Sequence, residues 1–201
     1  YKKIIKYYCV YLTKSTFIVL CLFSLLKAKA QNYIELSAGI ASYHIPASRF
    51  TFSGIQPLLL SGIHRYTGPS QRLSLGMQLS FNKSKYQGNG IQIQGLISFM
   101  PDLGKHIQLS LSTGPGFQFS FYPSRPQTWK DDKWKEGKRF KGVITLPLQL
   151  SLAYKSIQTG HLVARPYIAY RLQGHFRYTP DLTPLPKSMI LVGFTFNKNQ
   201  F

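Results

Sequence analysis

Residues 107–122 read IQLSLSTGPGFQFSFY, and apolar and polar side chains alternate along nearly all of this stretch. Successive side chains of a β-strand point to opposite faces, so a period of two indicates a strand with one apolar and one polar face. Residues 72–82 and 140–154 repeat the pattern. These three stretches predict long strands.

Five further segments fit the same period less cleanly, and no helical period competes with them after residue 31. They are residues 33–43, 55–66, 90–100, 162–178 and 188–197. The run QPLLL at residues 56–60 blurs the alternation, so the faces of that segment stay unassigned. The total is eight strands, an even number, as bacterial membrane barrels have.

The predicted connections alternate in length. Short ones follow the second, fourth and sixth strands, at residues 67–71, 101–105 and 155–160, and the longest connection is 123–139. Short periplasmic turns and longer external loops are typical of up-and-down barrels in the outer membrane. The sequence therefore predicts an all-β fold, an eight-stranded antiparallel up-and-down transmembrane β-barrel.

A soluble lipocalin-like barrel would also alternate, with its apolar face turned inward. A soluble exterior carries charges of both signs, but Glu35 is the only acid inside any predicted strand. The polar face consists mostly of Gly, Ser, Gln and Thr, which can fill a narrow lumen. Ten tilted residues cover about 25 Å, the height of an outer-membrane apolar band. We therefore expect the apolar face to contact lipid in a bacterial outer membrane.

Aromatic residues near the strand ends are candidates for girdles at the level of the lipid headgroups. They are Tyr33, Tyr43, Tyr66, Phe81, Phe99, Phe121, Phe140, Tyr154 and Tyr178. The ordinary β-propensity of aromatic residues is the alternative explanation.

Residues 1–30 have the order of a secretory signal peptide: a basic start, an apolar run at residues 17–26, and Ala28-Lys29-Ala30 before Gln31. A transmembrane helix needs about 20 apolar residues, and this run is shorter. We predict cleavage after residue 30, which leaves residues 31–201 as the barrel domain. Both cysteines of the chain lie in the leader, so we expect no disulfide or thiolate metal site in the mature protein.

The formal net charge is +19, from 25 Lys and Arg against 6 Asp and Glu. Such an excess often indicates nucleic-acid binding. Export separates the protein from nucleic acid, so we expect no nucleic-acid partner. Outer-membrane lipid and the phosphates of lipopolysaccharide are the expected surroundings of these charges.

Arg165, Arg171 and Arg177 are spaced by six, so they share one face of a predicted strand with His175. An arginine at the bilayer midplane costs about 2–4 kcal/mol, so this face is predicted to line the lumen. The full predicted lumen charge cluster is Glu35, Arg72, Arg165, Arg171, His175 and Arg177. It is interpreted either as an anion track or as paired side chains that fill the lumen. An eight-stranded barrel is just wide enough for side chains, which argues against a diffusion pore.

Glu35 and two of these arginines are predicted at the periplasmic end of the lumen. A buried charge is costly unless it is paired and hydrogen-bonded. We therefore predict that Glu35 pairs with Arg165 or Arg72. Arg165 is favoured because barrel closure leaves only the last strand between its strand and that of Glu35.

The long loop at residues 123–139 contains both tryptophans of the protein among six basic and three acidic residues. Interleaved aromatic and basic side chains can bind glycans or phosphates by stacking and charge. The candidate ligand contacts are Arg125, Trp129, Lys130, Lys133, Trp134, Lys135, Lys138 and Arg139. A solvated loop that only neutralises surface phosphate is the alternative.

Catalytic chemistry has candidates but no spacing that supports it. The side chains considered are His44, His64, His175, Ser120, Glu136 and Asp181. A nucleophile needs an oriented base, and no such arrangement follows from their positions. We predict no catalytic residue, no cofactor and no metal site.

The chain ends with ILVGFTF at residues 190–196 and with Phe201. This end resembles the C-terminal strand of outer-membrane barrels, and residues 31–201 resemble the small eight-stranded families common in Bacteroidota. The resemblance implies that the barrel-insertion machinery reads Gly193, Phe194, Phe196 and Phe201. The tail at residues 197–200 departs from the pattern.

The expected function is that of a non-enzymatic outer-membrane β-barrel. It would be structural, or would bind an anionic or glycan partner through its basic, aromatic external loops. Two alternatives stay open: a lipid-A-modifying or other outer-membrane hydrolase, and an accessory subunit of a larger transport or secretion complex.

Overall fold

The computed structural model describes residues 32–45, 51–52, 54–67, 70–83, 88–122, 125, 127–130, 132–155, 157–159, 162–176 and 183–198. The predicted signal peptide and its cleavage site lie outside the described residues, as do Arg177, Tyr178 and Phe201.

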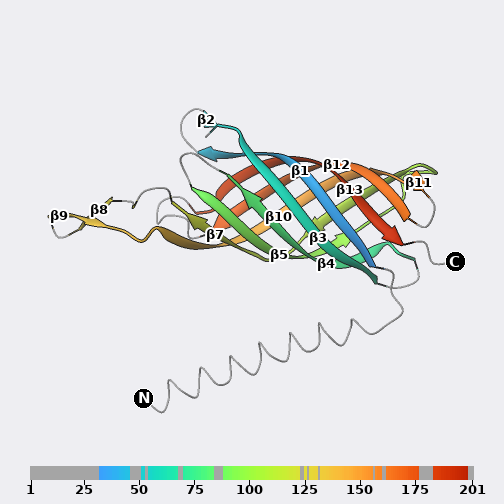
Figure 1. Ribbon diagram of the computed structural model, residues 1–201, viewed down its shortest axis with the longest axis horizontal. Coiled ribbons are helices and arrows are strands. Elements are labelled where there is room, and N and C mark those ends of the chain that lie inside the picture. Colours follow the sequence, from blue (N-terminus) through green and yellow to red (C-terminus); the bar gives the residue numbers. More distant parts are fainter. Residues whose placement is uncertain are drawn as a thin grey trace, which may run out of the picture. The chain divides into compact units, whose positions relative to one another are not determined.

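The fold is all-β, and its main sheet closes into a barrel (Figure 1). The strands are β1 (Asn32–Ile45), β2 (Thr51–Phe52), β3 (Gln56–Thr67), β4 (Leu73–Asn82), β5 (Asn89–Phe99), β6 (Ile107–Thr113), β7 (Gly116–Phe121), β8 (Gln127–Lys130), β9 (Lys133–Glu136), β10 (Phe140–Tyr154), β11 (Ile157–Thr159), β12 (Leu162–Phe176) and β13 (Leu185–Lys198). Neighbours in sequence pair antiparallel around the wall, β13 pairs with β1, and β10 pairs with β12.

Strands β6 and β7 are two halves of one barrel strand. Against β5, Ile97 lies opposite Thr113 and Gln94 opposite Gly116, so the register does not change across the gap. The interruption falls at Pro115, which has no N–H to give to the ladder. With these halves joined, the wall has eight strands, and the predicted fold class is confirmed.

The two faces of the wall separate as the alternation predicts. Along β10, for example, Leu146, Leu148 and Leu150 are exposed on the outside, whereas Gln149 and Ser151 are buried inside. Soluble monomers rarely expose apolar patches beyond a few hundred Å². A closed wall with apolar side chains outside is instead the arrangement that a bilayer requires.

One side of the lumen is apolar, which the alternation did not predict. Its buried cluster consists of Ala41, Leu58, Leu60, Tyr167, Ala169, Met189 and Leu191. In β3 the inward Leu58 and Leu60 are flanked by outward Pro57 and Leu59. Because both faces are apolar there, residues 56–60 showed no clear period.

Three of the predicted girdle tyrosines are instead inside the barrel. Tyr33, Tyr43 and Tyr66 are buried, since they share the inward parity of their strands. Five other members of the predicted girdles lie outside and are exposed: Phe81, Phe99, Phe121, Phe140 and Tyr154.

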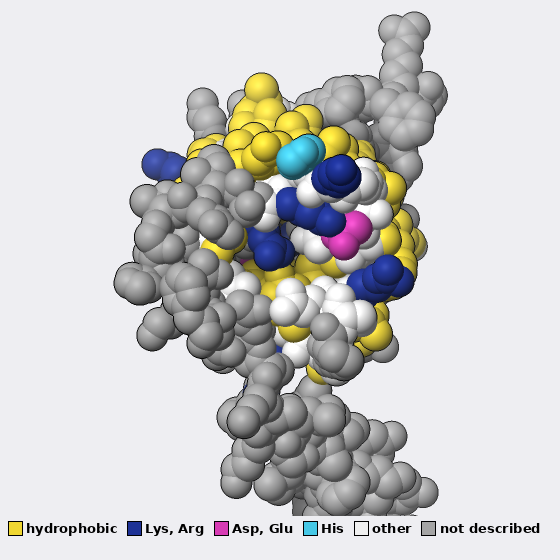
Figure 2. Space-filling view, turned by 90° about the vertical axis from the view of Figure 1, so that its right-hand side faces the viewer, with side chains coloured by type: hydrophobic (Ala, Val, Ile, Leu, Met, Phe, Trp, Pro, Cys, Tyr) yellow, Lys and Arg dark blue, Asp and Glu magenta, His cyan; other side chains and the backbone are white. Residues whose placement is uncertain are grey.

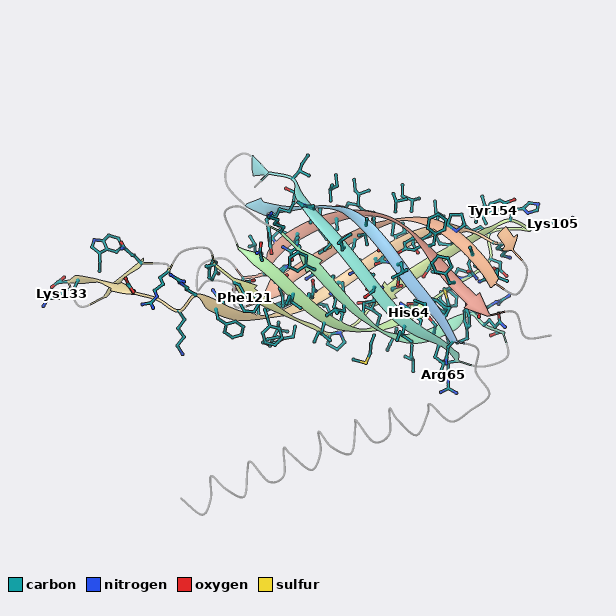
Figure 3. The ribbon with its side chains drawn as sticks, viewed as in Figure 1. His64, Arg65, Lys105, Phe121, Lys133 and Tyr154 are labelled. Atoms are coloured by element: carbon teal, nitrogen blue, oxygen red, sulfur yellow. The ribbon has the colours of Figure 1, made fainter. Side chains whose placement is uncertain are left out.

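The two ends of the barrel differ. At the long-loop end lie β2 and the β8–β9 hairpin, and at the short-turn end lie Lys105, Tyr154 and β11 (Figures 1 and 3). β1 begins and β13 finishes at the short-turn end (Figure 1). Within the described part of the chain, no helix is long and apolar enough to cross a membrane.

Candidate functional site: the barrel lumen and the external hairpin

Glu35 lies in the short-turn half of the lumen and is almost completely buried. Its Oε2 lies 2.7 Å from His64 Nε2 and accepts a hydrogen bond of 2.5 Å from Gln78 Nε2. The hydroxyl of Tyr167 donates to Oε1. These partners come from β3, β4 and β12, so one carboxylate joins four strands of the wall.

The predicted pairing of Glu35 with Arg165 or Arg72 is wrong. Arg165 Nη1 donates instead to the hydroxyl of Tyr66 at 3.1 Å, and Arg72 is exposed at the rim, outside the lumen cluster. The physical reason is that the places beside the carboxylate are taken by His64, from the adjacent strand β3, and by Tyr167, which lies on the same strand as Arg165.

Two glycines make room for His64. A Cβ at Gly62 would lie 2.8 Å from His64 Nε2, and a Cβ at Gly76 would lie 2.2 Å from Nδ1. On its other side the ring stacks on Tyr33, with centroids 4.8 Å apart. The sequence alone indicates His64 only as a catalytic candidate and gives it no inward position, because the faces of its strand stay unassigned.

Arg171 spans the middle of the lumen and has no exposed surface. Its Nε donates to Gln149 Oε1 at 2.7 Å, Nη1 to Gln94 Oε1 at 2.8 Å, and Nη2 to Gln78 Oε1 at 2.6 Å. Because Gln78 also donates to Glu35, the arginine and the carboxylate belong to one network. The predicted inward position of Arg171 agrees with this structure, and its partners are amides.

Below the arginine layer is a small polar cavity of about 40 Å³. Its lining includes Glu35, His64, Ser98, Ser112 and Ser151. A site of this size with several hydroxyl groups suits a few ordered water molecules, and it is too small for a drug-sized ligand.

The long-loop half of the lumen holds His175 and Lys187, both completely buried. Lys187 Nζ lies 5.0 Å from the ring centroid of Tyr43, and the His175 ring lies 5.2 Å from the same ring. Gln118 Nε2 donates to the Tyr43 hydroxyl at 3.3 Å. The sequence pattern predicts the last strand only from residue 188, so Lys187 falls outside it, whereas the strand begins at Leu185.

At the short-turn rim, Lys155 Nζ lies 2.8 Å from Asp102 Oδ1. The hydrogen bond from Lys155 is the main cause that lowers the pKa of the Asp102 carboxyl. Figure 2 views this end and shows basic side chains gathered there, with an acidic side chain beside them. The pair is partly solvated, so it contributes little to stability.

The long external loop contains a hairpin rather than irregular chain alone. β8 and β9 pair with Trp129 opposite Trp134, and Trp134 is 65% exposed. Arg125 and Glu136 form an exposed ion pair at the base of the hairpin. The hairpin projects beyond the barrel wall, with Lys133 near its tip (Figure 3).

The remaining predicted ligand contacts divide into two groups. Lys138 and Arg139 are exposed where the hairpin joins β10. The backbones of Trp129, Lys130 and Lys135 belong to the hairpin, and their side chains lie outside the description.

In the C-terminal strand, Phe194 faces outward and is exposed, whereas Gly193 faces inward. Recognition of these residues by the insertion machinery stays a prediction. Among the described residues, no group of three or more His, Cys, Asp and Glu side chains lies close enough to hold a metal ion.

Comparison with solved structures finds several that are similar to this chain. The crystal structure of Neisserial surface protein A is similar to this chain with a TM-score of 0.53 at 12% identity, over 86% of this chain and 100% of the other. The N-terminal β-barrel domain of Pseudomonas aeruginosa OprF gives 0.49 at 15% identity, over 84% and 99%. Ail, the attachment invasion locus protein of Yersinia pestis, gives 0.47 at 8% identity, over 83% and 99%. No protein-family model and no curated protein matches.

The likeness to Neisserial surface protein A concerns the fold alone. Closure of the sheet leaves the wall without an unpaired edge, and its outer side chains suit hydrocarbon. The chain is therefore a small transmembrane β-barrel of the kind found in bacterial outer membranes.

Proposed function

We propose that this protein is a non-enzymatic outer-membrane barrel that binds an anionic glycan at the cell surface through the β8–β9 hairpin. The observation that carries the proposal is the exposed Trp134 on a projecting hairpin that also carries Lys133. An exposed indole offers a flat surface for stacking on a sugar ring, and adjacent ammonium groups attract sulfate, phosphate or carboxylate. Lipopolysaccharide and sulfated polysaccharides have this chemistry.

The filled lumen supports a role at the surface rather than in diffusion. Arg171 and three glutamines occupy the middle of the barrel, as expected for an interior just wide enough for side chains. The structural part of the function is then to hold the external hairpin on a rigid wall.

The geometry of His64 argues against the hydrolase alternative. In a serine hydrolase one ring nitrogen meets the acid and the other meets the nucleophile. Here Nε2 faces Glu35, whereas Nδ1 faces Gly76 and has no hydrogen-bond partner. Among the described residues, no hydroxyl nucleophile bonds the ring nitrogen where the mechanism needs one. We also propose that the barrel belongs to one of the small eight-stranded families common in Bacteroidota.

The test measures binding of heparin fragments and of purified lipopolysaccharide to the refolded barrel in detergent. The variant Lys133→Ala/Trp134→Ala should weaken binding about tenfold or more, since it removes the stacking surface and one charge. Lys105→Ala is the matched control, because Lys105 is an exposed lysine at the opposite end (Figure 3). Equal loss in both variants would mean that binding follows net charge and not the hairpin. Co-purification of stoichiometric partner proteins in mild detergent would instead favour the accessory-subunit alternative.

A further inference from the structure

The buried charges of the described lumen do not balance. They are one carboxylate, on Glu35, and two cations, on Arg171 and Lys187. Glu35 has three hydrogen-bond partners in the short-turn half, and Arg171 is bound by glutamines. The second cation, Lys187, has no carboxylate near it among the described residues.

Lys187 is also without a hydrogen-bond acceptor. Its Nζ is completely buried and has no hydrogen-bond partner among the described residues, and it lies over the face of the Tyr43 ring. A cation over an aromatic ring is attracted to it, but that contact leaves three N–H donors unused. A buried ammonium group in this state is strongly unfavourable unless it loses its proton or gains a counterion.

Other unbonded polar atoms surround the same half of the lumen. They are both amide atoms of Gln56, Asn82 Oδ1, Gln118 Oε1 and His175 Nδ1. All four side chains are buried. They come from β3, β4, β7 and β12, and the register places them toward the long-loop end of the wall, as it does Lys187.

The middle layer provides an internal comparison. There Arg171 has its hydrogen-bonding groups matched by Gln78, Gln94 and Gln149. Lys187 differs from Arg171 in this respect, because its ammonium group is buried and no hydrogen-bond acceptor of the described residues reaches it.

We propose that the long-loop half of the lumen is a site for one small monovalent anion of the halide class, held by Lys187. A single negative charge matches Lys187, since Arg171 and Glu35 already belong to one network through Gln78. Gln56 Nε2 is an available second donor. The site is separate from the β8–β9 hairpin, so it is independent of the proposed glycan binding.

A direct test is crystallographic. Crystals of the refolded barrel are soaked in sodium bromide, and an anomalous difference map is computed at the bromine edge. The proposal predicts one peak in contact with Lys187 Nζ inside the barrel. Peaks confined to the outer surface, with only water beside Lys187, would overturn it.

A solution test uses thermal unfolding in detergent at constant ionic strength, with sodium chloride replacing sodium gluconate. The unfolding midpoint of the unmodified barrel should rise by roughly 3 °C or more when chloride is raised from far below its dissociation constant to about ten times that constant. Lys187→Met should abolish this response, whereas Lys155→Met, which removes a rim cation paired with Asp102, should retain it. A midpoint that is the same in both salts, as a neutral Lys187 amine predicts, would contradict the proposal. If Lys187→Met does not refold, the bromide map of the unmodified protein decides alone.

Discussion

His64 Nε2 lies 2.7 Å from Glu35 Oε2, and this contact joins β3 to β1 inside the barrel. Both side chains are buried. The carboxylate also links Gln78 and Tyr167, and through Gln78 it reaches Arg171. One acidic residue therefore organises most of the polar lumen.

Glu35→Gln should lower the free energy of unfolding by about 3–5 kcal/mol, because it leaves buried partners of the carboxylate unmatched. The measurement is the temperature at which the folded band disappears on a denaturing gel. Asp102→Asn, at the solvated rim, should change stability by about 1 kcal/mol or less. Since Arg165 bonds Tyr66 and not Glu35, adding Arg165→Met should give no rescue. If Arg165→Met did rescue stability, the result would support the Glu35–Arg165 pair that the sequence predicts.

Gly76→Ala should destabilise the barrel by about 1–3 kcal/mol, the usual range for overpacking. The new Cβ would lie 2.2 Å from His64 Nδ1 and would push the ring away from Glu35. Gly95→Ala is the matched control, as a Cβ there meets nothing within 4 Å. Chemical unfolding in detergent compares the stabilities of the two variants. Equal losses of stability would show that the position of the His64 ring does not depend on the absence of a side chain at Gly76.

Arg171→Ala should open the middle of the lumen, because the guanidinium that fills it is removed. In planar lipid bilayers we expect small, steady conductance steps from this variant and none from the unmodified barrel. Arg165→Ala, which changes a partly exposed side chain near the short-turn end, should remain silent. Equal conductance of the Arg171 variant and the unmodified barrel would mean that other side chains close the lumen.

Protease added to intact cells should cut first within residues 123–139, since the β8–β9 hairpin projects from the wall (Figure 1). The short turn at residues 67–71 should be cut only after the outer membrane is opened. The reverse order would place the long loops in the periplasm.

The wall of the barrel was predictable from sequence because its outer face has one simple requirement. Apolar side chains at every second position, as in residues 107–122 and 140–154, suffice to identify strands and their outward face. Even the break at Pro115 did not disturb the parity.

The lumen was less predictable, because its contacts depend on which strands are neighbours and on how far each side chain reaches. Glu35 and Arg171 were predicted to face inward, yet the partner of Glu35 came from the strand whose faces were blurred by Leu58 and Leu60. Lys187 was missed because a proline-flanked lysine before an apolar run looks like a loop residue. The pairing of β8 with β9 was not predicted either, since these two strands have few apolar residues and show no alternation of apolar and polar side chains.

The central claim is that the described strands form a closed barrel in the outer membrane, and its most direct test is heat-modifiable migration of the protein from an outer-membrane fraction. A closed barrel resists unfolding by detergent in the cold, so an unheated sample should migrate faster than a boiled one. Recovery of the mature chain as a soluble periplasmic monomer, with the same migration before and after boiling, would contradict the account.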